Sequence, residues 1–318
     1  MKSSPKISVV CGAFNEEANV HELYERIVKV FQNLDYTFEI IIIDNASTDR
    51  TVENLRDIAR DDKRLKVIVN ATNFGHVRSP YYALLQAHGD AVVFMASDLQ
   101  DPPELIPDYI KKWESGSKIV LAVKNRSSGG WIMKGLRNFY YKLLSIVSNE
   151  SMVPNATGAG IFDQNVIKVL RTLEDPLPYF RGLVTQLGFK VDTLEFHQPA
   201  RKEGITKNSF ATLFDLALLG FANYSKAPLR LLTVAGFITS LVSIGIAISY
   251  FIIKLLNWYS FDLGLAPVVI GVFFFGAIQI FALGLIGELL VSVQHRLRKM
   301  PLVIESERIN FDENEENR

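Results

Sequence analysis

Cysteine is nearly absent from this chain, and neither sign of charge is in excess. The 318 residues include one cysteine, Cys11, in an apolar stretch. A single thiol excludes an internal disulfide and argues against a cysteine-based metal site. Lysine and arginine total 34, as do aspartate and glutamate, so no net field attracts nucleic acid. Because His76, His88 and His197 also lack metal-ligand spacing, we predict neither a nucleic-acid partner nor a zinc site.

A targeting signal is also missing at the amino terminus. Residues 1–6 are polar and lead directly into a strand pattern, so we expect neither a signal peptide nor a transit sequence. The chain does contain two long stretches without charge, 231–253 and 263–287. Each could cross about 30 Å of hydrocarbon as a helix, and such long uncharged runs are rare in soluble cores. We predict two transmembrane helices, with a pair of buried core helices as the alternative.

Basic residues flank the two apolar stretches on their outer sides. Lys226 and Arg230 precede the first stretch, whereas the connection between the two holds only Lys254 and Asp262 as charged residues. Four basic residues follow the second stretch: His295, Arg296, Arg298 and Lys299. The positive-inside rule therefore predicts that both ends are cytoplasmic. Small residues within the stretches would suit helix packing in a homo-oligomer, namely Gly236, Gly245, Gly271 and Gly276.

Short β-branched stretches alternate with helical patterns over the first 125 residues. The stretches are 7–11, 38–44, 65–70, 91–96 and 118–123. Strands separated by helices of this length predict a doubly wound, mostly parallel α/β sheet. Ligands bind at the carboxyl ends of such strands, where this sequence places Asn15, Glu16, Asp44, Asn73, Gly75 and Asp98. We further expect a glycine-rich turn at 157–160, a strand at 190–197 and a disordered acidic tail from 305 to 318.

The most informative stretch is Ala-Ser-Asp-Leu-Gln-Asp-Pro-Pro-Glu, residues 96–104. An apolar strand ends there in carboxylates, an amide and two prolines. Asp98 offers a hard oxygen ligand of the kind that Mg²⁺ or Mn²⁺ takes while it holds a diphosphate. Asp98 could instead cap a helix, although Asp101 fits that role better. The stretch predicts a nucleotide-sugar site.

Four motifs in this order resemble the family 2 polyisoprenyl-phosphate glycosyltransferases, a GT-A family that includes dolichol-phosphate mannose synthase and bacterial undecaprenyl-phosphate glucosyltransferase. Residues 13–16 are similar to P-x-Y-N-E, 44–51 to D-D-G-S-x-D-x-T, 98–104 to D-L-Q-D-P-P-E and 201–207 to R-x-x-G-x-S-K. The likeness extends from the first strand through the second apolar stretch. It implies that the protein is an integral membrane protein of the bacterial inner membrane with a cytoplasmic catalytic domain.

The expected domain organisation follows from the resemblance together with the apolar stretches. A GT-A Rossmann-like domain would cover 1–207, and two transmembrane helices would lie within 229–293. Residues 208–228 carry an apolar face at helical spacing, which favours an amphipathic helix at the membrane surface or, alternatively, a core helix of the domain. Residues 294–318 would form a cytoplasmic tail.

The resemblance also implies roles for individual residues. Asp98 and Gln100 would bind Mg²⁺ or Mn²⁺, and Asp98, Arg201 and Lys207 would act in catalysis. The nucleotide-diphosphate sugar would contact Phe14, Glu16, Asp44, Asn73, Gly75, Lys124 and Arg126. The polyprenyl phosphate acceptor would lie against Arg201, Gly204, Thr206 and Lys207. The implied reaction is the inverting transfer of one hexose, with UDP-glucose favoured as donor.

Two departures from the family pattern leave other functions open. Ala96 stands where the family has the first aspartate of D-x-D, which removes one metal ligand or sugar contact. Asn45 replaces the second acidic residue of the nucleotide motif, so base recognition would rest on Asp44 or on backbone groups. A GDP-mannose-dependent mannosyltransferase and a catalytically silent nucleotide-sugar-binding membrane protein are the alternatives.

Overall fold

The computed structural model describes residues 4–124, 156–173, 180–197 and 301–311, with single further positions between 153 and 199 and short helical pieces between 236 and 293. The chain divides into two compact units. The first comprises residues 1–145, 150–213 and 299–318, and the second comprises residues 146–149 and 214–298. The expected residues Arg126, Arg201, Gly204, Thr206 and Lys207 and the helix expected over 208–228 lie outside the described residues.

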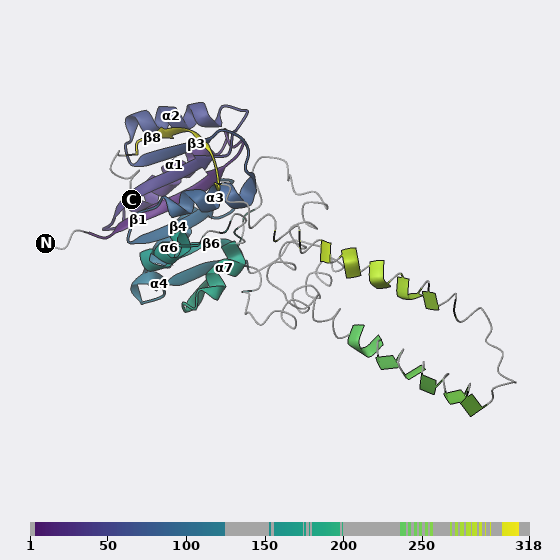
Figure 1. The fold of residues 1–318 in the computed structure, drawn as a ribbon. Coiled ribbons are helices and arrows are strands. Elements are labelled where there is room, and N and C mark those ends of the chain that lie inside the picture. Colours follow the sequence, from purple (N-terminus) through teal and green to yellow (C-terminus); the bar gives the residue numbers. More distant parts are fainter. Residues whose placement is uncertain are drawn as a thin grey trace. The chain divides into compact units, whose positions relative to one another are not determined.

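One eight-stranded sheet forms the centre of the first unit, in the order β7-β5-β6-β4-β1-β2-β3-β8 (Figure 1). The strands are β1 (Lys6–Ala13), β2 (Thr37–Asp44), β3 (Leu65–Asn70), β4 (Ala91–Ala96), β5 (Ile119–Lys124), β6 (Ala156–Asp163), β7 (Val191–Phe196) and β8 (Glu305–Ile309). All run in one direction except β6 and β8, which are antiparallel to their neighbours. The predicted mostly parallel, Rossmann-like α/β sheet is confirmed.

Helices cover both faces of this sheet. The described helices are α1 (Val20–Phe31), α2 (Thr51–Asp61), α3 (Gly75–Leu85), η1 (Pro103–Leu105), α4 (Ile106–Glu114), α6 (Gln164–Arg171) and α7 (Phe180–Gln186). Apolar residues of α1, α2 and α4 pack on one face, and those of α3, α6 and α7 pack on the other. Along β2, Ile40 and Ile42 face the first layer while Ile41 and Ile43 face the second, because side chains alternate along a strand. Burial on both faces explains this unbroken apolar run.

Cys11 lies in the first of these two cores. Its side chain is fully buried, and burial, with a smaller effect from the charge of Asp101, raises the pKa of the thiol. A neutral buried thiol packs as a small apolar group. The interpretation of Cys11 as a core residue is therefore confirmed.

The glycine-rich turn predicted at 157–160 is wrong, because these residues belong to strand β6. This strand lies between β4 and β5 and is antiparallel to both. Gly160 has φ 156°, and a Cβ there would come within 2.0 Å of the Val120 carbonyl oxygen. The glycine is needed for close backbone approach to β5, which the local sequence does not distinguish from a turn.

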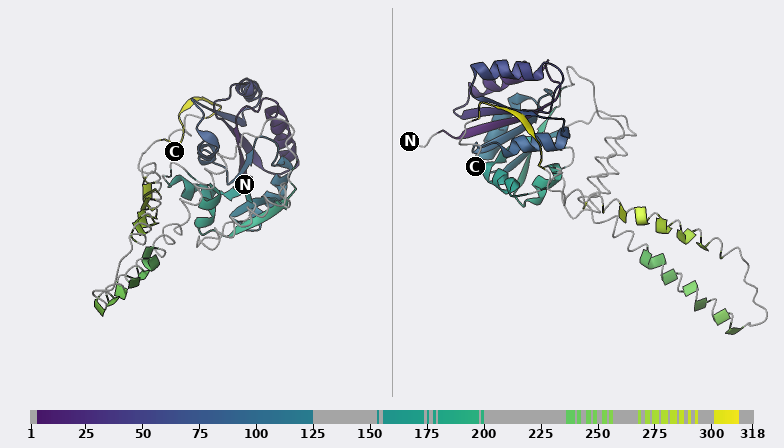
Figure 2. Two further views of the ribbon diagram at one scale, coloured as in Figure 1. Left: turned by 90° about the vertical axis from the view of Figure 1, so that its right-hand side faces the viewer. Right: turned by 45° about the horizontal axis from the view of Figure 1, so that its top comes forward.

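The disordered tail predicted from residue 305 is also wrong for residues 305–311. Strand β8 pairs antiparallel with β3 at one end of the sheet and is the yellow strand in Figure 2. Its side chains bind both neighbouring helices, since Arg56 of α2 pairs with Glu307 and Arg308 donates to Tyr82 of α3. The Asn310 amide donates to the carbonyl oxygens of Ala59 and Leu65 at 2.7 and 2.9 Å. Pairing with β3, these polar contacts and the packing of Leu302, Ile309 and Phe311 against the two cores order this segment.

The second unit is described only at separated helical positions. These positions carry large apolar side chains with high exposure, such as Phe237 (65%), Leu256 (77%), Val272 (66%) and Ile280 (73%). In the described part of the chain, none of the helices combines the length and the apolar character needed to cross a bilayer. The two predicted transmembrane helices fall partly on positions outside that part and stay a prediction.

Candidate functional site

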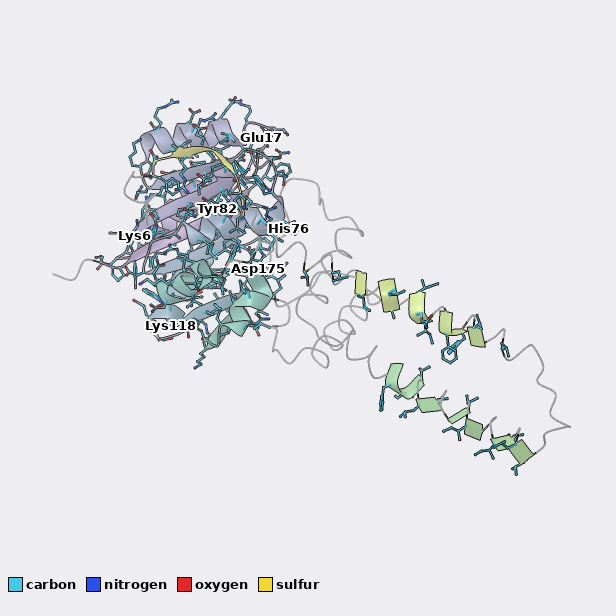
Figure 3. All side chains as sticks on the ribbon, in the orientation of Figure 1. Lys6, Glu17, His76, Tyr82, Lys118 and Asp175 are labelled. Atoms are coloured by element: carbon cyan, nitrogen blue, oxygen red, sulfur yellow. The ribbon has the colours of Figure 1, made fainter. Side chains whose placement is uncertain are left out.

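The carboxyl ends of the parallel strands meet at one edge of the sheet. Ala13 at the end of β1 pairs with Asp44 at the end of β2, and Asp44 pairs with Val69 of β3. On the other side of β1, Gly12 pairs with Ala96 at the end of β4. The four loops that follow these strands therefore start level with one another. Figure 3 shows Glu17 and His76 near this edge, with Lys6 at the opposite edge.

Two further strands end at the same edge. Strands β4 and β5 are both antiparallel to β6, which lies between them, so β5 runs parallel to β4 and delivers Lys124 to the edge at which β4 ends. Strand β7 is parallel to β5, with Phe196 paired to Lys124. The expected acceptor loop, 201–207, thus begins within five residues of this edge. The structure brings together the predicted residues Phe14, Glu16, Asp44, Asn73, Gly75, Asp98, Gln100 and Lys124.

Strained backbone gathers at this edge. Among the described residues, four other than glycine have positive φ, and three of them follow β1, β2 and β4. These are Asn15 (φ 56°), Ala46 (φ 61°) and Leu99 (φ 60°). The left-handed region is costly for residues with a Cβ, and such strain is typical of ligand sites. The strain makes this edge the candidate site on grounds independent of the motifs.

Replacing Ala46 with glycine is expected to stabilise the protein by about 0.5–1 kcal/mol. Glycine removes the left-handed strain at φ 61°, and this gain exceeds the extra entropy it gives the unfolded chain. Urea unfolding of the full chain in detergent measures the difference. Ala18 lies exposed in a nearby turn without positive φ, so Ala18→Gly is the matched control and should lower stability. An Ala46→Gly protein no more stable than the wild type would show that the strain is relieved elsewhere.

The Asp44 carboxylate shapes the loop after β2. Asp44 is fully buried, one of its oxygens accepts the Ser47 N–H at 2.9 Å, and the other accepts the Ser47 hydroxyl. Burial raises the pKa of Asp44, against the opposing effect of these hydrogen bonds. The Ser47 hydroxyl in turn accepts the Asn15 N–H at 2.8 Å. Asp44 thereby ties the first loop to the second, and its predicted contact with the donor stays a prediction.

Glu16 and Glu17 continue this connection between the two loops. The Glu16 N–H donates to the Thr51 hydroxyl at 2.8 Å, and its carboxylate accepts from the Asn19 amide. The Glu17 carboxylate accepts the Arg50 N–H at 2.9 Å. Asp49 accepts the N–H and hydroxyl of Thr51, the first residue of α2. The first two motifs therefore form one hydrogen-bonded platform beside the strand ends.

Asn45 holds the loop after β3 in place. Its amide donates to the Asn73 Oδ1 at 2.8 Å and to the Gly75 carbonyl oxygen at 3.3 Å. Its carbonyl accepts from the Asn70 amide and from the Phe74 N–H, at 3.1 and 2.9 Å. An aspartate could not donate either of the first two bonds. Asn45, which replaces the second acidic residue of the family motif, therefore holds loop 70–75 in place. The sequence alone did not reveal this role.

Asp98 differs from the other carboxylates at the strand ends because it is partly exposed, whereas Asp44 and Asp101 are buried. Its Oδ1 accepts the Gln100 N–H at 3.1 Å, across the left-handed Leu99. Asp101 does not cap η1, so its predicted capping role is wrong. Its Oδ2 instead accepts the Ala96 N–H at 3.3 Å, which turns the chain back towards β4.

The end of the same motif is anchored to α1. Both carboxylate oxygens of Glu104 accept from the Arg26 guanidinium, at 2.9 and 2.6 Å. The Ser97 hydroxyl donates to the Gly12 carbonyl oxygen at 2.8 Å. Asp98 therefore lies on a segment that is fixed on both sides.

The described residues offer a divalent cation few ligands at this edge. Among the residues that the structure describes, no three His, Cys, Asp or Glu side chains lie close enough to share a metal ion. Asp98 and Gln100 supply hard oxygen atoms of the kind that Mg²⁺ and Mn²⁺ prefer. Mg²⁺ commonly binds through one or two carboxylates together with substrate phosphates and water. The donor set is consistent with an ion that is completed by a diphosphate.

The chain is similar to known glycosyltransferases. Residues 8–170 match the model of glycosyl transferase family 2. An uncharacterized glycosyltransferase of Synechocystis sp. is 30% identical over 303 residues, 95% of each chain. A prophage bactoprenol glucosyl transferase homolog of Escherichia coli is 28% identical, over 94% of this chain and 98% of its own. Glucosyl-3-phosphoglycerate synthase of Mycobacterium tuberculosis, in complex with Mn²⁺, UDP and phosphoglyceric acid, covers 70% of this chain and 78% of its own, with 20% identity and a TM-score of 0.48.

Proposed function

The chain belongs to glycosyl transferase family 2, and from this premise we propose that it transfers a single hexose from a nucleotide-diphosphate sugar to a polyprenyl phosphate at a membrane surface. Relatives named as bactoprenol glucosyl transferases support glucose as the sugar and a polyprenyl acceptor. UDP-glucose is accordingly the donor we favour. The product is an inverted, lipid-linked glucosyl phosphate.

One topological observation carries this proposal. The chain leaves the sheet after Phe196 at the carboxyl ends of the strands, and it returns at Glu305, which pairs with Asn70 at the same ends. Both connections to the apolar stretches therefore start from the edge that holds Asp98 and Lys124. For an enzyme whose acceptor is a membrane lipid, this topology lets the chain run from the edge that holds the site directly into the segments expected to span the membrane.

The two apolar stretches serve as the membrane anchor in this proposal. Their described positions expose large apolar side chains, and helices that are apolar and exposed need a lipid or protein partner. Because β7 and β8 belong to one sheet, the chain between them must cross a bilayer an even number of times. Two spans satisfy this condition, and the flanking basic residues support a cytoplasmic location for both ends.

The proposed transfer depends on compensating the negative charges of the donor diphosphate and the acceptor phosphate more than on a general base. An oxygen of the acceptor phosphate attacks the anomeric carbon from the side opposite the diphosphate, and the bond to the diphosphate oxygen breaks with its electron pair. No proton has to be removed, because the attacking oxygen is already an anion. A divalent cation bound by Asp98 and Gln100 would supply positive charge for the leaving group. Arg201 and Lys207 would bring the acceptor phosphate into line with the sugar.

A radiochemical transfer assay tests this function. Purified full-length protein in detergent is incubated with undecaprenyl phosphate and either UDP-[¹⁴C]glucose or GDP-[¹⁴C]mannose, with and without EDTA. We expect label in the lipid fraction with UDP-glucose and its loss with EDTA. Label from GDP-mannose alone would establish the mannosyl alternative. Donor binding without any labelled lipid would overturn the enzymatic proposal in favour of a silent binding protein.

A further inference from the structure

We propose that residues 301–311, here called the return segment, position the donor-binding loop 70–75 and thereby make donor affinity depend on the chain that re-enters from the apolar stretches. The inference rests on the proposed function, because that function makes loop 70–75 part of the donor site. The return segment supplies no group to the substrate in this proposal. It acts through the backbone and the helix that carry Asn73 and Gly75.

The return segment contacts the loop directly. The Ala71 N–H donates to the Ile304 carbonyl oxygen at 2.8 Å, one residue beyond the end of β3. The pairing of β8 with β3 shifts register between Val69 and Asn70, where the loop begins. A bulge at such a point redirects the strand end and the side chains that follow. The direction in which the chain leaves β3 is therefore set partly by its pairing with β8.

Helix α3, which begins at Gly75, is held by the same segment. Arg78 donates to the Pro301 carbonyl oxygen at 2.6 Å and lies over the ring of Phe74. Further along the helix, Arg308 donates to the Tyr82 hydroxyl at 3.1 Å and to the Gln86 side-chain oxygen at 3.0 Å. Two arginines thus join the return segment to the first and third turns of α3.

Arg308 makes most of the side-chain contacts between the return segment and α3. Its side chain is 18% exposed, and both oxygens of Glu305 accept from it, at 2.5 and 2.8 Å. The guanidinium also lies over the Phe311 ring, 4.9 Å from the centroid. A partly buried guanidinium with this many partners has one arrangement, so it can fix the helix relative to the strand.

The loop is consequently held from two sides. Asn45 braces it from β2 through Asn73 and Gly75, as described above, and the return segment braces it through Ala71 and α3. The second brace begins at Pro301, two residues after Lys299, the last of the four basic residues between the second apolar stretch and the return segment. Loosening this brace should affect the donor loop without touching the platform formed by the first two motifs.

The test compares Arg308→Ala with a matched control on the same segment. Arg56→Ala removes the pair with Glu307, whose side chains are 46% and 37% exposed and which joins the segment to α2 instead of α3. Ion pairs with this much exposure contribute little to stability. The readouts, all on full-length protein in detergent, are UDP affinity by calorimetry, KM for donor and for acceptor, and hydrogen exchange of residues 70–78. We expect Arg308→Ala to weaken UDP binding and raise the donor KM by about 5- to 20-fold, corresponding to roughly 1–2 kcal/mol, while the acceptor KM stays within twofold. Exchange of residues 70–78 should accelerate in this variant alone.

The outcomes separate this inference from the proposed function. If the wild type binds UDP and Arg308→Ala binds it equally well with unchanged exchange, the positioning role is refuted while the transferase proposal stands. If the wild type binds no nucleotide, the proposed function fails, and unchanged exchange in Arg308→Ala would refute the positioning role separately. Should Arg308→Ala fail to fold, Arg78→Ala, which removes the bond to Pro301, is held to the same criteria.

Discussion

Replacing Asp98 with asparagine is expected to lower kcat/KM for sugar transfer on the order of 10³-fold. Asp98 is the partly exposed carboxylate at the end of β4, on a segment fixed by Ser97 and Glu104. A neutral amide there would bind a divalent cation weakly, so charge on the leaving diphosphate would remain uncompensated as the bond breaks. The effect should appear mainly in kcat, because the charge develops in the transition state. Initial rates over a Mn²⁺ titration measure both parameters.

The matched control for this substitution is Asp108→Asn. Asp108 is an exposed aspartate in the first turn of α4, ten residues further along the chain. Its variant should keep activity within about twofold, since surface changes of this kind cost little. If Asp98→Asn kept more than a tenth of the wild-type kcat/KM at saturating Mn²⁺, the metal-binding role of Asp98 would be refuted. Retained UDP binding with no turnover in either variant or in the wild type would favour the silent-binding alternative.

The parallel part of the sheet could be predicted because each strand carries its own signal. The run from Ile40 to Ile43 is apolar at every position, which is what a strand buried on both faces requires. Each such run ends in polar residues, so the edge that gathers them could also be predicted. Asp44 and Asp98 were placed at this edge correctly, since each stands at or just after the end of an apolar stretch.

The antiparallel strands could not be predicted because their signals lie in distant residues. Glu305 to Ile309 reads as a polar tail, and its order depends on pairing with β3, which is 237 positions away between Ser306 and Val69. Strand β6 contains two glycines that read as a turn until the backbone of β5 is seen to need the space. In both β8 and β6, the local sequence pattern favours a tail or a turn, whereas the tertiary contacts require a strand. The tertiary contacts determine the structure.

The motifs located the candidate site, but they did not assign each side chain its partner. Asp44, Asn45 and Asp101 all lie in motif positions, and all three are buried. Each accepts hydrogen bonds from neighbouring loop groups. Which carboxylate faces outward depends on backbone geometry, such as the left-handed Leu99 that follows Asp98. Whether a motif side chain holds a loop in place or is available to bind a ligand depends on its three-dimensional contacts. No single motif contains that information.

Glu39→Gln is expected to lower the free energy of unfolding by about 3–5 kcal/mol. Glu39 lies at the edge of the sheet opposite the candidate site, 3% exposed, within 2.7 Å of the Lys6 ammonium and 3.0 Å of the Lys66 ammonium. The Ser8 hydroxyl donates to its other oxygen at 2.6 Å. The glutamine variant would leave the buried Lys66 charge without its carboxylate, and that penalty dominates the loss. Urea unfolding at pH 7 measures the change.

Two variants separate this effect from the loss of an ordinary ion pair. Asp57→Asn removes a partner of Arg60 in a pair whose side chains are both more than 60% exposed, and it should cost at most about 0.5 kcal/mol. The double variant Glu39→Gln, Lys66→Met should be less destabilised than Glu39→Gln alone, because it also removes the uncompensated ammonium. A loss below 1 kcal/mol for Glu39→Gln would show that the cluster is not a stabilising ion network.

The same cluster predicts how stability depends on pH. Burial alone would raise the pKa of Glu39, but hydrogen bonds from Lys6 and Ser8 and the charges of Lys6 and Lys66 outweigh it and lower this pKa from 4.5 to about 2. A folded-state pKa below the unfolded value means that the contribution is complete above pH 4.5 and is lost as the pH falls towards 2, by roughly 3 kcal/mol in all. The stability difference between the wild type and Glu39→Gln should therefore shrink across this window and stay constant between pH 6 and 8. A difference that did not change between pH 5 and pH 2.5 would mean that Glu39 is not held ionised by its lysines.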